Sequence, residues 1–486
     1  MCDQSVRKYS LSQTLMIICL LIYSRPVPAQ SSIGSSDTLQ ITPPGKATPF
    51  IIGEIHITGN RKTRAYIIER ELSFKKGDTV YLSELVRSFE LAREQLINTR
   101  LFNEAVVYVK GFRGYIADIE IDVKERWYLF PLPYVRPVDR NLSAWAERDY
   151  SLSRVNYGMK LSYYNFTGRN DYLRAWLITG YSRQLELAYD LPFVDKSLKQ
   201  GLGMSIIYSR QKELNVLTVN NQQEFINADT IPYAGKYLYE RMNFSLRYYY
   251  RPALHTRHFI RLSFNKVGID SAVTVWNPHY FQNGKRQVLY PELSYSVDYS
   301  NADYIPYPLK GILFETGLTR RGINADMNLW QLYVKLTRSW QVANKTFFSF
   351  QNWSMLKLPL DQPFYNQQFL GYGDLYMRGL DRYVINGVAG FVIRNSLMRE
   401  LFNFNIPFTR IPSHDRIPFR IYARTFADYG YVYNQNFTAN SLTNRILYTA
   451  GFGLDVVTFY DLTLKFDYSF NQLGQNGLFL HIRNDF

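Results

Sequence analysis

An arginine followed by a glycine is the first candidate functional group in this sequence. Arg378 and Gly379 lie in GYGDLYMRGLDRYVING, a long glycine-punctuated segment between runs of strand-like alternation. A loop arginine is usually a solvated charge, so its role depends on where the loop lies. Inside a partly dehydrated lumen it must be matched by carboxylates, because an unpaired charge there is costly. The guanidinium favours bidentate pairing, and the glycine lets the backbone turn tightly.

The residue types that carry most enzyme and metal chemistry form no cluster in the sequence. The six histidines are scattered, and His255 and His258, three residues apart on a predicted strand, would face opposite sides of it. The sequence contains no nucleophile elbow, phosphate-binding loop or zinc motif. We therefore predict a protein that is not an enzyme and that uses no metal and no cofactor.

The N-terminal segment has the pattern of an export signal. Arg7 and Lys8 precede an apolar run over residues 14–23, and Ala29 offers a small residue for cleavage. The run is too short to span a bilayer as a helix. We predict a signal peptide over residues 1–29, followed by a flexible linker over residues 30–49 that is rich in Ser, Thr, Pro and Gly.

Cysteine usage indicates a bacterial envelope protein. Cys2 and Cys19 both lie inside the predicted signal peptide, so the mature chain would have no disulfide and no thiolate metal site. A lipoprotein is disfavoured because Ile17 and Ile18 precede Cys19, where small residues would be expected. Export without disulfides is typical of the bacterial envelope rather than of small disulfide-rich secreted proteins.

The chain is basic, and the excess of positive charge lies in its C-terminal part. The formal net charge is +15, and residues 1–29 hold three Lys/Arg and one Asp, which leaves 15 − 2 = +13 for the mature chain. Residues 50–130 hold thirteen basic and twelve acidic residues and are nearly neutral. Nucleic-acid binding would suit a basic chain, but charges dispersed among the strands of an exported protein favour a water-filled lumen or anionic lipid headgroups. We predict no nucleic-acid partner.

Residues 50–126 mix strand and helix patterns. A strand is predicted over residues 51–60, helices over 63–74 and 82–99 with Ser83 as N-cap, and two strands in EAVVYVK and YIADIEIDVKE. With the Gly59-Asn60 turn, Gly77 between the helices and INTRLFNEAVVYV before the second strand, this order resembles a POTRA domain. The resemblance implies a periplasmic docking module that receives unfolded or partner chains, partly by strand addition.

From residue 127 onward, short alternating strands replace the helical patterns. A soluble sandwich also alternates, but the 40 Tyr and 32 Phe suit aromatic girdles, and strands of about ten residues suit a tilted bilayer crossing. We count fifteen to sixteen strands between Tyr128 and Phe486. Because a closed single-chain barrel usually has an even number, we predict an all-β transmembrane barrel of sixteen antiparallel strands over residues 127–486. The first strand, YLFPLPYV, contains two prolines and suits only an edge or seam position.

The last strand ends on an aromatic residue. In GLFLHIRNDF, four apolar residues share one parity: Leu478, Leu480, Ile482 and the terminal Phe486. This pattern resembles the C-terminal recognition strand of outer-membrane barrels, which implies that assembly machinery reads it when the barrel inserts.

Signal peptide, one POTRA-like domain and a sixteen-stranded barrel ending in Phe together resemble the BamA/TamA-type superfamily. Its members fold an Arg-Gly-aromatic motif of the sixth extracellular loop back into the barrel, which implies this role for Arg378, Gly379 and Leu380. Leu380 departs from the usual Phe or Tyr. RTFADYGYVY (residues 424–433) resembles the family's Asp-x-Gly strand and implies Asp428 and Gly430 as wall partners. Glu400 is the candidate second acid, with its register open by a residue or two, and Asp428 could also be an ordinary lumen carboxylate.

The resemblance implies an outer-membrane protein that assists insertion of outer-membrane proteins or translocation of a polypeptide. Its partners would be outer-membrane lipid, unfolded outer-membrane or exported polypeptides, and periplasmic or lipoprotein accessory subunits. Four alternatives stay open: a passive, anion-favouring pore, dedicated secretion of one partner protein, a lipid-related role, and an outer-membrane barrel enzyme with Ser and His on one outer face.

Overall fold

The computed structural model describes residues 49–137, 151–324, 326–373, 375–411, 414–435 and 440–483. The predicted signal peptide, the predicted linker up to residue 48 and Phe486 lie outside the described residues. No helix within these ranges is both long enough and apolar enough to cross a membrane.

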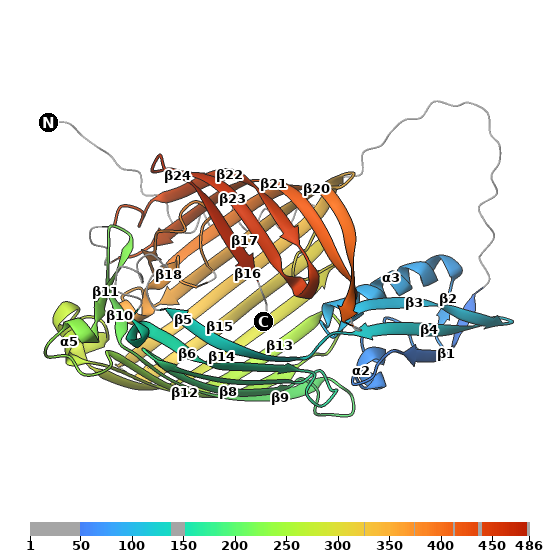
Figure 1. Ribbon diagram of the computed structural model, residues 1–486, viewed down its shortest axis with the longest axis horizontal. Helices are drawn as coiled ribbons and strands as arrows, with labels where there is room; N and C mark the ends of the chain where they lie inside the picture. The colour runs from blue at the N-terminus through green and yellow to red at the C-terminus, as the bar shows by residue number, and fades with distance from the viewer. Residues whose placement is uncertain are drawn as a thin grey trace. The chain divides into compact units, whose positions relative to one another are not determined.

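The N-terminal part is a small α/β domain, drawn in blue in Figure 1. Its sheet has the order β2-β1-β4-β3, with β1 parallel to β4 and the other neighbours antiparallel. Two helices cover the sheet, and the core between them contains Ile67, Leu96 and Ile119, all buried. The elements are β1 (Phe50–Thr58), α2 (Ala65–Glu69), β2 (Thr79–Val80), α3 (Leu82–Asn98), β3 (Phe102–Arg113) and β4 (Ile116–Glu125).

Two local predictions for this domain differ from the structure. The first helix is α2 alone, five residues long, because the Glu125 carboxylate accepts the backbone N–H groups of Lys62 and Thr63 and holds the preceding chain in a non-helical connection. Ser83 is not the N-cap of α3. Tyr81 occupies that position in extended conformation, because the pairing of β2 with β1 keeps the backbone extended up to it.

The rest of the chain forms one sheet of sixteen antiparallel strands that curls into a barrel (Figure 1), as predicted. The strands are β5 (Leu129–Pro137), β6 (Val155–Tyr164), β7 (Tyr172–Gly180), β8 (Arg183–Leu191), β9 (Gln200–Gln211), β12 (Tyr239–Tyr250), β13 (Thr256–Ile269), β14 (Gln287–Ala302), β15 (Gly311–Asn324), β16 (Met327–Ala343), β17 (Thr346–Leu358), β20 (Ala389–Ile411), β21 (His414–Tyr433), β22 (Ile446–Val457), β23 (Thr463–Asn471) and β24 (Asn476–Arg483).

Further short elements lie in the connections at the end of the barrel opposite the α/β domain (Figure 1). They are the hairpin of β10 (Glu213–Val219) and β11 (Gln222–Asn227), the helix α5 (Ser271–Trp276), and the pair β18 (Gln368–Leu370) and β19 (Ile385–Asn386). The segment between β17 and β20, which contains Arg378, belongs to this end.

The two faces of the barrel strands differ as the alternation predicts. On β16, Trp330, Leu332 and Trp340 are exposed on the outer face. Between them, Ser339 is buried and donates a hydrogen bond to Ser349 of β17 at 3.0 Å. An apolar outer face and a polar inner face are the arrangement that a bilayer imposes on a barrel.

The two end strands of the sheet, β5 and β24, are not hydrogen-bonded to each other within the described residues. The sequence predicts a fully closed barrel, and the prolines of β5 explain the difference. The backbone carbonyl of Tyr128 accepts the N–H of Tyr164 on β6. Because backbone groups alternate along a strand, the N–H and C=O groups of even-numbered residues of β5 point toward β6, and those of odd-numbered residues point toward β24. Pro131, Pro133 and Pro137 are all odd-numbered and have no N–H to donate across this seam.

Candidate functional site

The Arg378 loop lies inside the barrel wall. Met377 and Leu380 are buried, and they belong to an apolar cluster with Val392 of β20, Val432 of β21 and Leu447. Leu380, which stands where the family usually has an aromatic residue, is therefore packed against the wall by aliphatic contacts.

Arg378 makes a bidentate ion pair with Asp428 of β21. Arg378 Nε donates to Asp428 Oδ2 at 2.8 Å and Nη2 donates to Oδ1. Arg378 Nη1 also donates to Ser396 Oγ of β20 at 2.8 Å, and its guanidinium lies 4.2 Å from the centre of the Phe426 ring. The two charged side chains are 5% and 0% exposed, so they are withdrawn from water and compensate each other.

Two glycines allow the loop and the wall to approach. Gly379 has a φ of +83°, and a Cβ there would lie 3.0 Å from Ser469 Cβ. At Gly430, a Cβ would lie 3.1 Å from the carbonyl oxygen of Phe391 and 3.6 Å from the sulfur of Met377. The absence of a side chain at Gly430 therefore makes room for Met377 against the wall. This is the wall position that the sequence predicted for Gly430.

Glu400 does not reach Arg378. Its carboxylate lies 3.6 Å from Lys345 Nζ, and its N–H donates to the Lys345 carbonyl in the turn between β16 and β17. That turn is at the end of the barrel next to the α/β domain, whereas Arg378 meets β20 four residues earlier, at Ser396. The hydroxyl of Ser396 takes the place that the second acid was expected to fill.

The loop is also attached to the last two strands, which the sequence reasoning missed. Asn471 Nδ2 donates to the carbonyl of Gly379 at 2.8 Å. His481 of β24 lies 3.2 Å from Asp381, and its ring stacks on Tyr376 with centroids 4.6 Å apart. His481 has the opposite parity to Leu478, Leu480 and Ile482, and this was the available signal that it faces the lumen. Those three leucine and isoleucine side chains are 72%, 54% and 62% exposed on the outer face.

A second buried charge cluster lies on the same stretch of wall. Arg424 of β21 pairs with Asp455 of β22 at 2.9 Å and with Asp467 of β23. All three side chains are buried. The guanidinium of Arg424 lies 5.4 Å from the Phe426 ring, on which Arg378 also stacks. Phe426 thus contacts both arginines.

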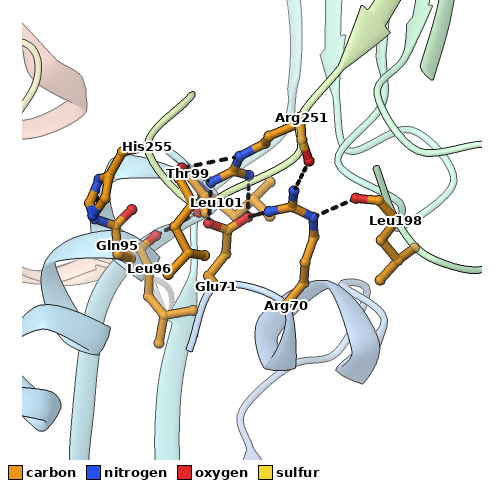
Figure 2. A network of polar contacts seen from close by, with 10 residues as sticks. Arg70, Glu71, Gln95, Leu96, Thr99, Leu101, Leu198, Arg251 and His255 are labelled. Carbon is orange, nitrogen blue, oxygen red and sulfur yellow. Dashed lines mark hydrogen bonds and ion pairs between the residues drawn. The ribbon is translucent and has the colours of Figure 1, made fainter. Parts of the chain in front are cut away.

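The α/β domain is fixed to the barrel by a network around Glu71 (Figure 2). Arg251, in the turn after β12, donates from Nη1 and Nη2 to the two Glu71 oxygens at 2.5 and 2.7 Å. The neighbouring Arg70 donates from Nε to the carbonyl of Leu198, in the turn between β8 and β9, at 2.7 Å. Glu71 and Arg251 are 1% and 8% exposed.

Burial and charge act in opposite directions on the Glu71 carboxyl. Burial disfavours the carboxylate, but the charge and the hydrogen bonds of Arg251 outweigh it, and the pKa of Glu71 lies below its ordinary value. Asp461, in a turn between β22 and β23, behaves in the same way. Burial opposes its charge, and Arg126 of the domain connection, at 2.8 Å, holds its pKa low. Both carboxylates are therefore ionised partners of arginines at the junction.

A sixteen-stranded sheet with an apolar outer face, preceded by an α/β domain and holding an arginine loop inside its wall, has the architecture of an outer-membrane barrel. Residues 165–476 match the Omp85 superfamily domain, and residues 50–126 match POTRA, described as a surface antigen variable number repeat. The chain belongs to the Omp85 superfamily. It is an outer-membrane protein with a periplasmic POTRA domain, and it assists insertion of outer-membrane proteins or translocation of a polypeptide.

Solved structures are similar to this chain at low identity. BamA from Haemophilus ducreyi lacking POTRA domains 1–3 is 15% identical, with 89% of this chain and 84% of that chain covered and a TM-score of 0.49. CdiB from Escherichia coli is 13% identical, with 89% and 75% covered and a TM-score of 0.50. The likeness concerns the fold alone. No curated protein matches the chain.

Proposed function

We propose that this protein inserts other barrel proteins into the outer membrane, and that the seam between β5 and β24 is where it acts. Of the five odd-numbered positions of β5, three are prolines, so this wall offers few backbone donors to β24. An unfolded strand that presents its own donors and acceptors would find unpaired edges there.

The Arg378 loop supports insertion over passive diffusion. A diffusion pore needs an open lumen, whereas here a buried ion pair fixes a loop inside the wall. The same loop contacts β24 through His481 and Asp381, so its position and that of the seam strand are linked. Dedicated secretion of one passenger is the second candidate, because the chain has a single match to the POTRA family.

Insertion of a strand at the seam needs no catalytic step. Backbone pairing along the seam and the exposed apolar outer face would provide what an inserting strand needs, and neither requires bond chemistry. Accessory periplasmic or lipoprotein subunits would act by delivering clients to the POTRA domain.

Depletion of the protein, followed by comparison of the outer-membrane and surface proteomes, tests the function. Insertion predicts that many unrelated barrel proteins are lost from the membrane together, while their synthesis continues. Loss of one surface or secreted protein with an unchanged set of barrels would support dedicated secretion instead. If small-solute uptake fell while both proteomes stayed unchanged, the passive pore would be correct and the proposal wrong.

A further inference from the structure

The turn between β14 and β15, residues 303–310, bends into the barrel from the periplasmic end. Tyr307 and Leu309 are 5% and 7% exposed. They pack on side chains of the inner wall, and the rings of Tyr307 and Tyr422 have centroids 5.2 Å apart. The wall residues of this cluster are Phe347, Met398, Tyr422 and Val457. A turn that merely joined two strands at the rim would not bury its tip in this way.

The tip of the turn is bonded to the charge cluster beside the Arg378 loop. The Tyr307 hydroxyl donates to Asp455 Oδ2 at 2.6 Å, and Asp455 pairs with Arg424. Arg424 and Arg378 contact the same ring, that of Phe426. The periplasmic turn and the extracellular loop therefore meet on one stretch of wall.

The turn lies between two cavities at this point. A cavity of about 570 Å³ lies between the POTRA domain and the barrel, and Asp303, Tyr304 and Lys310 of the turn line it. On the other side of the turn, Tyr307 and Pro308 face Arg378 across a cavity of about 50 Å³. The smaller cavity has room for only a few water molecules between the turn and Arg378.

The POTRA domain holds this turn in place. Asn98, the last residue of α3, donates from Nδ2 to the carbonyl of Ala302 at 3.0 Å and accepts the N–H of Ile305 at 3.0 Å. The Tyr304 hydroxyl donates to Asp461, which pairs with Arg126. The turn is therefore fastened to the domain outside the barrel and to Asp455 inside it.

We infer that residues 303–310 form a periplasmic plug, that this plug closes the lumen next to the Arg378 loop, and that docking of the POTRA domain through Asn98 keeps it closed. Displacement of the domain would release the Ala302 and Ile305 contacts and let Tyr307 leave the wall. This inference goes beyond the proposed function, because it concerns access to the lumen whatever polypeptide the protein handles.

The test is the ionic conductance of the purified full chain in planar bilayers, which requires no client protein. The variants are Tyr307→Ala, Tyr307→Phe, which keeps the ring but loses the hydroxyl, and Asn98→Ala. The matched control is Asn301→Ala, at an exposed position of β14 just before the turn. A heat-modifiable band on unboiled gels verifies that each barrel is folded.

We expect Tyr307→Ala and Asn98→Ala each to raise the open fraction at least about tenfold. Tyr307→Ala loses a hydrogen bond to a charged carboxylate, and Asn98→Ala loses two neutral hydrogen bonds that together contribute about the same factor. Tyr307→Phe should lie between them and the wild type, and Asn301→Ala should match the wild type. Folded Tyr307→Ala and Tyr307→Phe with unchanged conductance would overturn the plug. If Tyr307→Ala raised the open fraction and Asn98→Ala did not, the inference that the POTRA domain controls the plug would be wrong.

Discussion

At the scale of single residues, burial decides what the Arg378–Asp428 pair contributes. A solvent-exposed ion pair is worth about 0–1 kcal/mol, whereas breaking a buried pair by removing one partner costs about 3–5 kcal/mol. Here both side chains are almost completely withdrawn from water, and Ser396 and Phe426 complete the surroundings of the guanidinium. Removing one partner of this pair should therefore cost as much free energy as it does in other buried pairs, although the pair lies in the lumen of a barrel.

Arg378→Ala should destabilise the loop by about 3–5 kcal/mol, because Asp428 would be left charged and unpaired. The sixteen-stranded sheet should stay folded, so the gel shift on heating should persist while client insertion falls. Arg378→Lys should restore only part of the activity, because an ammonium cannot reproduce the bidentate contact. Labelling of a cysteine at position 380 by an impermeant maleimide on intact cells reports the position of the loop tip.

The matched control for this prediction is Arg382→Ala, which removes an exposed arginine from the same loop. It should leave both labelling and insertion unchanged. Equal labelling of position 380 in the wild type and in Arg378→Ala would show that the ion pair does not hold the loop inside.

At the scale of the elements, the sequence predicted the strands well and their partners less well. Alternation and length predict the strands, because each outer face must be apolar along its own strand, and the even number usual in a closed barrel selects sixteen. Asp428 could be nominated from a local motif, the Asp-x-Gly pattern of its strand. The contacts of Glu71 with Arg251 and of Tyr307 with Asp455 join residues about 180 and 148 positions apart. These two contacts depend on which turns of the barrel lie next to the POTRA domain, and no local sequence pattern predicts this arrangement.

The prolines of β5 give a prediction about the seam. Pro131→Thr with Pro133→Thr restores two N–H donors that point toward β24, and threonine suits a strand. The seam should close more tightly, the barrel should resist urea better, and client insertion in liposomes should slow. The control is Leu132→Thr with Tyr134→Thr, at positions whose backbone groups already pair with β6. Unchanged or faster insertion in the proline variant would show that the seam is not the working edge.

At the scale of the whole molecule, the POTRA domain and the barrel are joined by buried arginine–carboxylate contacts. Glu71 and Asp461 both have a pKa below the ordinary value. Burial raises the pKa of each carboxyl, but Arg251 lowers that of Glu71 and Arg126 lowers that of Asp461 by more. A carboxyl whose pKa is lowered by folding contributes stability that is complete above its unfolded-state pKa and is lost as the pH falls through its folded-state pKa. The junction should therefore weaken in acid and not in mild base.

Glu71→Gln tests this junction directly. It leaves the buried Arg251 without its carboxylate, so the domain should detach from the turn after β12 while the barrel stays intact. Hydrogen exchange of α2 should rise in the variant at neutral pH, and in the wild type only as the pH falls below the ordinary Glu value of 4.5. Glu69→Gln, an exposed position on the same helix, is the matched control and should keep the wild-type profile. If Glu71→Gln exchanged like the wild type at every pH, the domain would be held by its other contacts, among which Asn98 and Arg126 would be the next pair to remove together.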